Sequence, residues 1–197
     1  MDSVQGFVLT GGRSRRMGTD KSRLSIDGQT FLQRIAAEMT ACGLSVTVVG
    51  GNSADTAFRH VPDVFPNWGA LGGVHAALAS CTSDWALVIA CDFPFVTRQL
   101  IHRLSESKET FEAVAPIQSD LIPQPLCSLY RVVPCLSRTE VLINSGERKP
   151  IALLQSVRTR WVLFDEIADL EGAERFFDNI NSPDDYSRIL SKGDDGG

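Results

Sequence analysis

Residues 7–21 read FVLTGGRSRRMGTDK, a short apolar run that leads directly into a loop rich in glycine and arginine. The run is typical of a buried strand, and the loop after it brings together paired glycines and four cationic side chains. Glycines let backbone N–H groups approach an anion closely, while arginine and lysine neutralise its charge. The whole chain has a formal net charge of −5, so this positive charge is a local feature. The stretch predicts a phosphate-binding loop at the end of a strand.

Length and composition indicate an ordinary globular protein. The chain has 197 residues, of which 43% are hydrophobic and 22% charged. We expect a single domain over residues 1–191, followed by a short polar tail at 192–197 that is predicted to be disordered. No apolar run approaches the ~20 residues of a membrane span, and the N-terminus lacks the layout of a signal peptide. These features predict a cytoplasmic protein that does not enter a membrane.

The overall charge and the cysteine pattern argue against nucleic-acid-binding, disulfide-linked and zinc-binding proteins. An isoelectric point near 5.2 argues against nucleic acid as the partner, because nucleic-acid-binding proteins usually carry an extended basic face. The five cysteines form no C-x-x-C pair, so the sequence favours reduced, mostly buried thiols over disulfides or a zinc site.

Strand and helix patterns alternate along the chain. Residues 85–90 form a continuous apolar run, typical of a central parallel strand covered on both faces. Thr30 and Thr97 are each placed to cap a helix. The alternation predicts an α/β fold with an open, mainly parallel sheet. Strands are expected at 5–10, 44–49, near 61, 85–90, 113–116, 126–130 and 160–164, and helices from 31 to about 42, at 74–79, after 97 and at 132–144.

Asp92 follows the run 85–90, at the same edge of the predicted sheet as the basic loop. In open α/β sheets, ligands bind beyond the carboxyl ends of the strands. An aspartate there suits Mg²⁺, which is bound through one or two carboxylates plus substrate phosphates. A lone Asp-x-Pro is also typical of a turn or helix cap, but the basic loop at the same edge favours the metal.

Two familiar phosphate loops do not fit the sequence. Lys21-Ser22 is preceded by Thr19-Asp20, without the glycine of the G-x-x-x-x-G-K-[ST] pattern, and no G-x-G-x-x-G follows the first strand. A remaining use of such a loop is nucleotidyl transfer, in which a triphosphate is held extended while pyrophosphate leaves. Positioning and charge neutralisation supply most of that catalysis.

Residues 9–21 closely resemble the signature of the molybdenum cofactor guanylyltransferase family, a group of nucleotidyltransferases. Matching segments follow in order: Asp63 with the glycine run 69–73, then 91–94, 124–130 and 177–185. Together they span nearly the whole chain. The resemblance implies a three-layer Rossmann-like nucleotidyltransferase fold with a mainly parallel central sheet.

The same resemblance implies a reaction, the transfer of GMP from GTP to Mo-molybdopterin with Mg²⁺ as cofactor and release of pyrophosphate. Asp92 would bind the Mg²⁺, and Lys21 the phosphates of GTP. Arg15 and Arg16 would hold either the triphosphate or the pterin phosphate. The implied GTP-binding set is Leu9, Thr10, Gly11, Gly12, Lys21, Asp63 and Asp92, and the implied catalytic set is Lys21, Asp92, Arg15 and Arg16.

On the acceptor side, Asn179 and Asn181 would line the molybdopterin. A helix-entry turn before Pro183 explains this asparagine pair equally well. Transient contact with molybdenum-insertion or acceptor proteins is expected from the reaction.

One departure from the family pattern bears on the glycine run, and two alternatives to the proposed reaction remain. The family's G-P-L-A-G loop reads G-A-L-G-G at 69–73, and the missing proline predicts a more flexible loop. Trp68, just before it, could stack on a base or pterin ring, or lie in an exposed lid. Gly12 favours GTP, since relatives that use CTP tend to carry alanine there. The alternatives are a cytidylyl- or other nucleotidyltransferase with a related phosphorylated acceptor, and a non-catalytic GTP- or pterin-binding relative.

Overall fold

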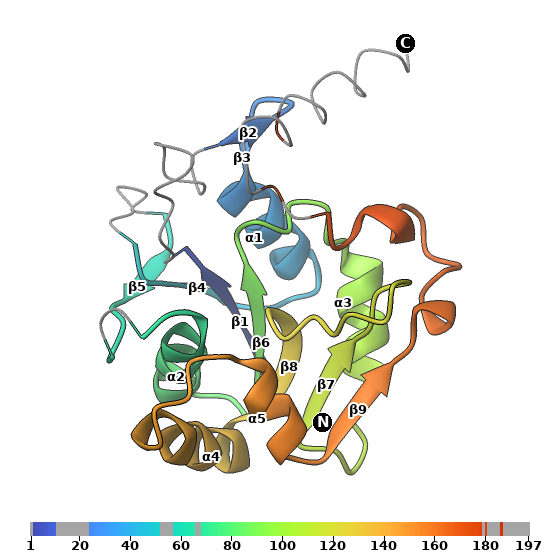
Figure 1. The fold of residues 1–197 in the computed structure, drawn as a ribbon. Helices are drawn as coiled ribbons and strands as arrows, with labels where there is room; N and C mark the ends of the chain where they lie inside the picture. The colour runs from blue at the N-terminus through green and yellow to red at the C-terminus, as the bar shows by residue number, and fades with distance from the viewer. Residues whose placement is uncertain are drawn as a thin grey trace.

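A computed structural model of the chain describes residues 2–10, 24–51, 57–65, 68–178, 180 and 186. Within these ranges, seven strands form one sheet in the order β5-β4-β1-β6-β8-β7-β9, and two short strands form a separate hairpin (Figure 1). The strands of the large sheet are β1 (Val4–Leu9), β4 (Val46–Val49), β5 (Arg59–Val61), β6 (Trp85–Ala90), β7 (Ala113–Pro116), β8 (Cys127–Arg131) and β9 (Thr159–Val162). The hairpin pairs β2 (Ser25–Ile26) with β3 (Gln29–Thr30).

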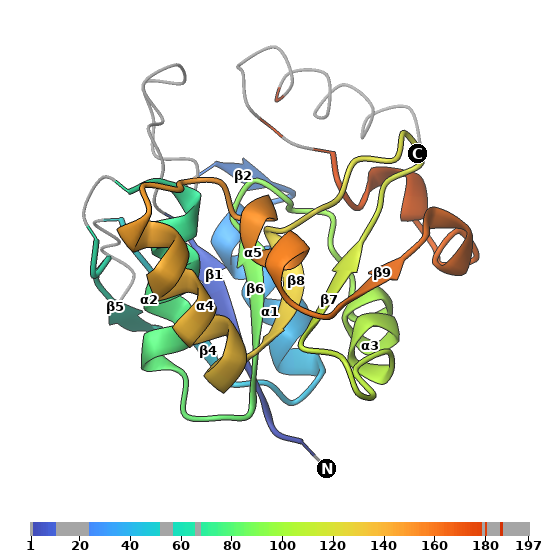
Figure 2. The same cartoon turned by 60° about the horizontal axis from the view of Figure 1, so that its bottom comes forward.

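Helices cover both faces of the sheet, which gives the three layers expected from the sequence. Figure 2 shows α4 and α5 in front of the strands and α1 behind them. The helices are α1 (Phe31–Ala41), α2 (Ala70–Ser80), α3 (Arg98–Glu106), α4 (Val132–Asn144) and α5 (Ile151–Ser156), with short 3-10 turns η3 (Phe164–Glu166) and η4 (Ala173–Arg175). Among the described residues, no helix is long and apolar enough to span a membrane.

Alternation along the central strands divides the core between the two faces. On β6, Leu87 and Ile89 pack with α1 and α3, whereas Ala86 and Val88 pack with α2, α4 and α5. Successive side chains of a strand point to opposite faces, so a strand that is apolar throughout must be covered on both. Every residue of β6 is indeed buried.

The sheet is mainly parallel, as predicted. Strands β5, β4, β1 and β6 run in one direction, and β8 is antiparallel to both of its neighbours. Because four adjacent strands are parallel, their carboxyl ends meet at one edge of the sheet. The fold class inferred from the sequence is confirmed.

The start of α2 differs from the expectation. The helix begins at Ala70 and includes Gly72 and Gly73, whereas the sequence predicts a turn-rich segment up to residue 73. Glycine disfavours a helix interior, but a Cβ on Gly73 would lie 3.3 Å from the Leu9 side chain, which would have to move by a few tenths of an ångström. Here the close packing of α2 on β1 outweighs the low helix propensity of glycine.

Other differences are small. α5 was not expected, and the strand bounds differ from those predicted by one or two residues. The helix at 132–144 matches its prediction. The tail at 192–197 lies outside the described residues.

The capping box of α1 yields a first prediction. The Thr30 hydroxyl accepts from Gln33 N at 3.2 Å, and Thr30 N donates to Gln33 Oε1 at 3.0 Å. Thr30→Ala should lower the free energy of unfolding by about 1 kcal/mol, because a helix N–H loses its partner. Urea denaturation measures this.

Thr40→Ala, on the same helix, is the matched control. The Thr40 hydroxyl only donates back to Ala36 O at 2.7 Å, so its loss should change the stability by less than about 0.5 kcal/mol. Equal losses in the two variants would contradict a special role for the cap.

Candidate active site

The candidate site is a row of strand ends along the carboxyl edge of the sheet. Val61 pairs with Val49, Val49 with Leu9, and Leu9 with Ala90, so β5, β4, β1 and β6 end in line. Neighbouring strands lie about 4.8 Å apart, so β5 and β6 are separated by about 14 Å. Asp63 follows one end of this row and Asp92 the other.

Thr10 fixes the middle of the row. Its backbone N–H donates to Val49 O at 3.0 Å, and its hydroxyl lies 3.0 Å from Gly50 O. Gly51 has a φ of +65°, and a Cβ there would lie 2.7 Å from the Thr10 hydroxyl oxygen. Only glycine permits this approach, so the ends of β1 and β4 are tightly joined.

The predicted phosphate loop follows directly in sequence. Thr10 and Leu9 are buried, and Leu9 O accepts from Cys91 N at 3.0 Å. The predicted site residues that lie outside the described residues are Gly11, Gly12, Arg15, Arg16, Lys21, Asn179 and Asn181. Leu9, Thr10, Asp63 and Asp92 are brought to the same edge.

Asp92 lies where three parts of the chain meet. Its segment leaves β6 in a turn closed by Phe93 N and Ala90 O at 3.2 Å. The backbone N–H of Ile180 approaches Asp92 O at 3.4 Å, and Phe93 contacts Phe177 edge-on, with ring centroids 6.3 Å apart. Ile180 is completely buried and packs with Ile26 and Phe31. Phe177 and Ile180 are therefore packed against the aspartate motif.

Asp63 occupies a different environment. Its side chain is half-buried, and burial raises the pKa of its carboxyl above the usual value. Asp63 follows β5 and Asp92 follows β6, two strands that lie about 14 Å apart in the sheet.

The residues present fit a magnesium ion that is completed by its substrate. No group of three or more His, Cys, Asp or Glu side chains within the described ranges could form a metal site from protein alone. Mg²⁺ commonly uses one or two carboxylates plus phosphate oxygens, and Asp92 supplies one such carboxylate.

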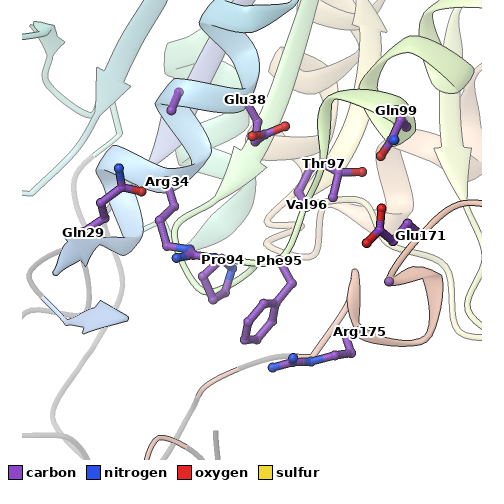
Figure 3. A pocket seen from close by; sticks show the side chains of 12 residues that line it. Gln29, Arg34, Glu38, Pro94, Phe95, Val96, Thr97, Gln99, Glu171 and Arg175 are labelled. Carbon is purple, nitrogen blue, oxygen red and sulfur yellow. The ribbon is translucent and has the colours of Figure 1, made fainter. Parts of the chain in front are cut away.

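A cavity of about 340 Å³ opens beside Pro94, between α1 and η4 (Figure 3). Figure 3 shows Arg34 reaching toward Pro94 and Arg175 lying beside Phe95. The Arg175 guanidinium carbon lies 4.0 Å from the centre of the Phe95 ring. Glu38, also on the wall, accepts from the backbone and guanidinium of Arg98 at 2.7–3.2 Å. The full lining is Gln29, Arg34, Ala37, Glu38, Pro94, Phe95, Val96, Thr97, Gln99, Glu171, Gly172 and Arg175.

The sequence does not predict this cavity, because its walls come from three segments that are far apart in the chain. Pro94 belongs to the matching segment 91–94, and Thr97 is an expected helix cap, but neither feature predicts a cavity.

A mainly parallel sheet with this arrangement of strand ends is the architecture of a nucleotidyltransferase. A family model described as "MobA-like NTP transferase domain" matches residues 6–161. The chain belongs to the MobA-like NTP transferase family. The family, the fold and the enzyme class expected from the sequence are confirmed.

Individual relatives agree over nearly their full length. A probable molybdenum cofactor guanylyltransferase from Pelotomaculum thermopropionicum is 30% identical, over 98% of this chain and 95% of that protein. A molybdenum cofactor guanylyltransferase from Vibrio atlanticus is 28% identical, over 92% and 93%.

Solved structures share the fold. The molybdopterin-guanine dinucleotide biosynthesis protein A from Archaeoglobus fulgidus has a TM-score of 0.81 at 24% identity, covering 97% of this chain and 99% of that one. The 2-C-methyl-D-erythritol 4-phosphate cytidylyltransferase from Thermus thermophilus has a TM-score of 0.69 at 16% identity, covering 98% and 100%.

The junction at Thr10 yields a second prediction. Thr10→Val keeps the side-chain shape but leaves the Gly50 carbonyl without its hydroxyl donor. We expect the free energy of unfolding to fall by about 1–2 kcal/mol, the cost of a buried group left without its hydrogen bond. Chemical denaturation tests this.

Thr10→Ser retains the hydroxyl and serves as the control. It should keep more of the stability than Thr10→Val, although it is the variant that loses a methyl group. The reverse order would show that packing, and not the hydrogen bond, joins the two strand ends.

Proposed function

We propose that this protein transfers GMP from GTP to Mo-molybdopterin, releasing pyrophosphate and forming a guanine dinucleotide cofactor. The observation that supports the proposal is the contact between Ile180 N and Asp92 O, because Ile180 lies between the two asparagines that are proposed to bind the acceptor. The printed names of the relatives agree with this reaction.

The nucleotide half of the site follows the row of strand ends. In this proposal GTP lies along the edge, with its nucleoside toward Asp63 and its phosphates toward Asp92. The backbone at Leu9, Thr10, Gly11 and Gly12 would contact the nucleotide. Lys21 would neutralise the triphosphate, and Arg15 and Arg16 the triphosphate or the acceptor phosphate.

Asp92 would hold Mg²⁺ against the phosphates of GTP. When bound, the ion neutralises charge on the triphosphate and on the departing pyrophosphate. The acceptor phosphate is already ionised, so the chain needs no strong general base. Its own residues position the two substrates and screen their charge.

The acceptor would lie on the opposite side of Asp92 from the nucleotide. Asn179 and Asn181 flank Ile180 in sequence and are the proposed pterin contacts. The cavity beside Pro94 has a volume of about 340 Å³, within the range of small-molecule sites, and its Phe95 and arginine side chains suit a flat, anionic acceptor. A cytoplasmic location and contact with molybdenum-insertion or acceptor proteins stay predictions.

Substrate choice tests the proposal directly. Purified protein is mixed with Mg²⁺, one of the four nucleoside triphosphates and Mo-molybdopterin, and pyrophosphate release is followed. GTP should support turnover at least about tenfold faster than CTP, a difference of roughly 1.4 kcal/mol.

Other outcomes distinguish the alternatives. Equal rates with GTP and CTP would contradict guanylyl specificity. Turnover with a sugar phosphate but not with molybdopterin would indicate a different acceptor. Nucleotide binding without turnover would indicate a non-catalytic relative.

The role of Asp92 gives a further prediction. Asp92→Asn removes the carboxylate charge at nearly constant volume, so kcat/KM should fall by at least about 10²-fold. Pyrophosphate release over a range of Mg²⁺ concentrations measures the loss, and thermal unfolding checks the fold.

Asp84→Asn is the matched control. Asp84 lies at the amino end of the same strand, where it accepts from Ser3 N at 2.8 Å. It should keep the wild-type rate, because it lies at the opposite edge of the sheet. A wild-type rate for Asp92→Asn would remove this residue from the metal site.

A further inference from the structure

Trp68 joins two parts of the chain that are distant in sequence. Its indole Nε1 donates to Glu147 O at 2.8 Å, and the guanidinium carbon of Arg148 lies 4.7 Å from its ring centre. Residues 147 and 148 belong to the loop between α4 and α5. This loop is therefore fastened to the residue just before the glycine run that begins α2.

The contacts of Trp68 favour a structural role over the two roles that the sequence leaves open. The residue is half-buried, not exposed. Its N–H is already bonded, and the Arg148 guanidinium lies over one face of its ring.

A second link lies beside the first. Phe65 packs against Trp68 with ring centroids 6.5 Å apart and meets His75 edge-on at 4.8 Å. His75 Nε2 lies 3.8 Å from the Glu140 carboxylate of α4. Burial lowers the pKa of His75, so this contact does not depend on an imidazolium charge at neutral pH. Trp68 thus contacts the α4–α5 loop directly, and Phe65 contacts His75 of α2, which in turn faces α4.

Trp68 also packs closely against the first turn of α2. A Cβ on Gly72 would lie 3.0 Å from Trp68 Cβ and 3.3 Å from Phe65 O. Trp68 N in turn donates to Phe65 O at 3.1 Å. Asp63 lies two residues before Phe65, so the chain that leaves the Asp63 end of the row leads directly into the contact between Phe65 and Trp68.

We propose that Trp68 is a positioning residue for the nucleoside triphosphate. It holds the Asp63 end of the row and the start of α2 against the α4–α5 loop, and it keeps the Arg148 guanidinium beside this part of the site. The inference rests on the proposed place of the nucleotide along the row, and not on the identity of the acceptor.

The test compares Trp68→Phe with Trp68→Ala. Phenylalanine keeps an aromatic ring and loses the bond to Glu147 O, whereas alanine loses the Arg148 and Phe65 contacts as well. Equilibrium binding of the nucleoside triphosphate that the wild type uses should weaken about fivefold in Trp68→Phe, as expected for one hydrogen bond, and further in Trp68→Ala.

In turnover, the KM for the nucleotide should rise by the same factors. The kcat and the KM for the acceptor should stay within about twofold of the wild type, because Trp68 touches neither Asp92 nor the C-terminal segment among the described residues. A general loss of folded protein would not raise the KM for the nucleotide while leaving kcat and the KM for the acceptor almost unchanged.

Trp161→Phe is the control for a general loss of packing. Trp161 is also half-buried but lies on β9, an edge strand remote from the row. It should lower the melting temperature without changing nucleotide affinity.

Unchanged nucleotide affinity in Trp68→Phe, or a loss equal to that of Trp161→Phe, would overturn the proposal. The binding measurement uses no acceptor. If molybdopterin proves to be the wrong acceptor, the proposed function fails while the role of Trp68 is still decided.

Discussion

The parallel pairing of β1 with β6 is the constraint on which the candidate site depends. Leu9 pairs with Ala90, and Leu9 O accepts from Cys91 N, so both strands end together. The loop after β1 therefore begins beside Asp92, although they are 80 residues apart in the chain. Burial of β6 on both faces makes this register expensive to shift, because a slip by one residue would exchange its two core faces.

The parts of this arrangement that the sequence predicts are those set by local chemistry. The apolar run at 85–90 could only be a covered strand, and Thr30 and Thr97 cap their helices as expected. The edge position of Thr10 and Asp92 followed from those strands. The start of α2 was not predicted, because the close packing of Gly72 and Gly73 against Trp68, Phe65 and Leu9 exists only in the folded chain. The cavity beside Pro94 was not predicted from the sequence either, because its walls come together only in the folded chain.

The strand order separates the two aspartates of the row. The sequence associates Asp63 and Asp92 with one nucleotide, but it gives no distance between them. The strand order inserts β4 and β1 between them, so about 14 Å separates the two strand ends. That separation suits the proposed arrangement, with the nucleoside of GTP toward Asp63 and its phosphates toward Asp92. Burial raises the pKa of the Asp63 carboxyl above its usual value.

The same reasoning explains how the glycine run at 69–73 can dispense with a proline. Considered locally, Gly69-Ala70 should leave the backbone more freedom than Gly-Pro would. In the folded chain, Ala70 already lies in the first turn of α2, and the neighbouring Trp68 is tied to Glu147 O across the α2–α4 layer. A proline would restrict the backbone of its own residue. Here the hydrogen bond from Trp68 to Glu147 O restrains the backbone just before α2. The restraint then depends on the α4–α5 loop, so the nucleotide end of the site is linked to residues 147 and 148.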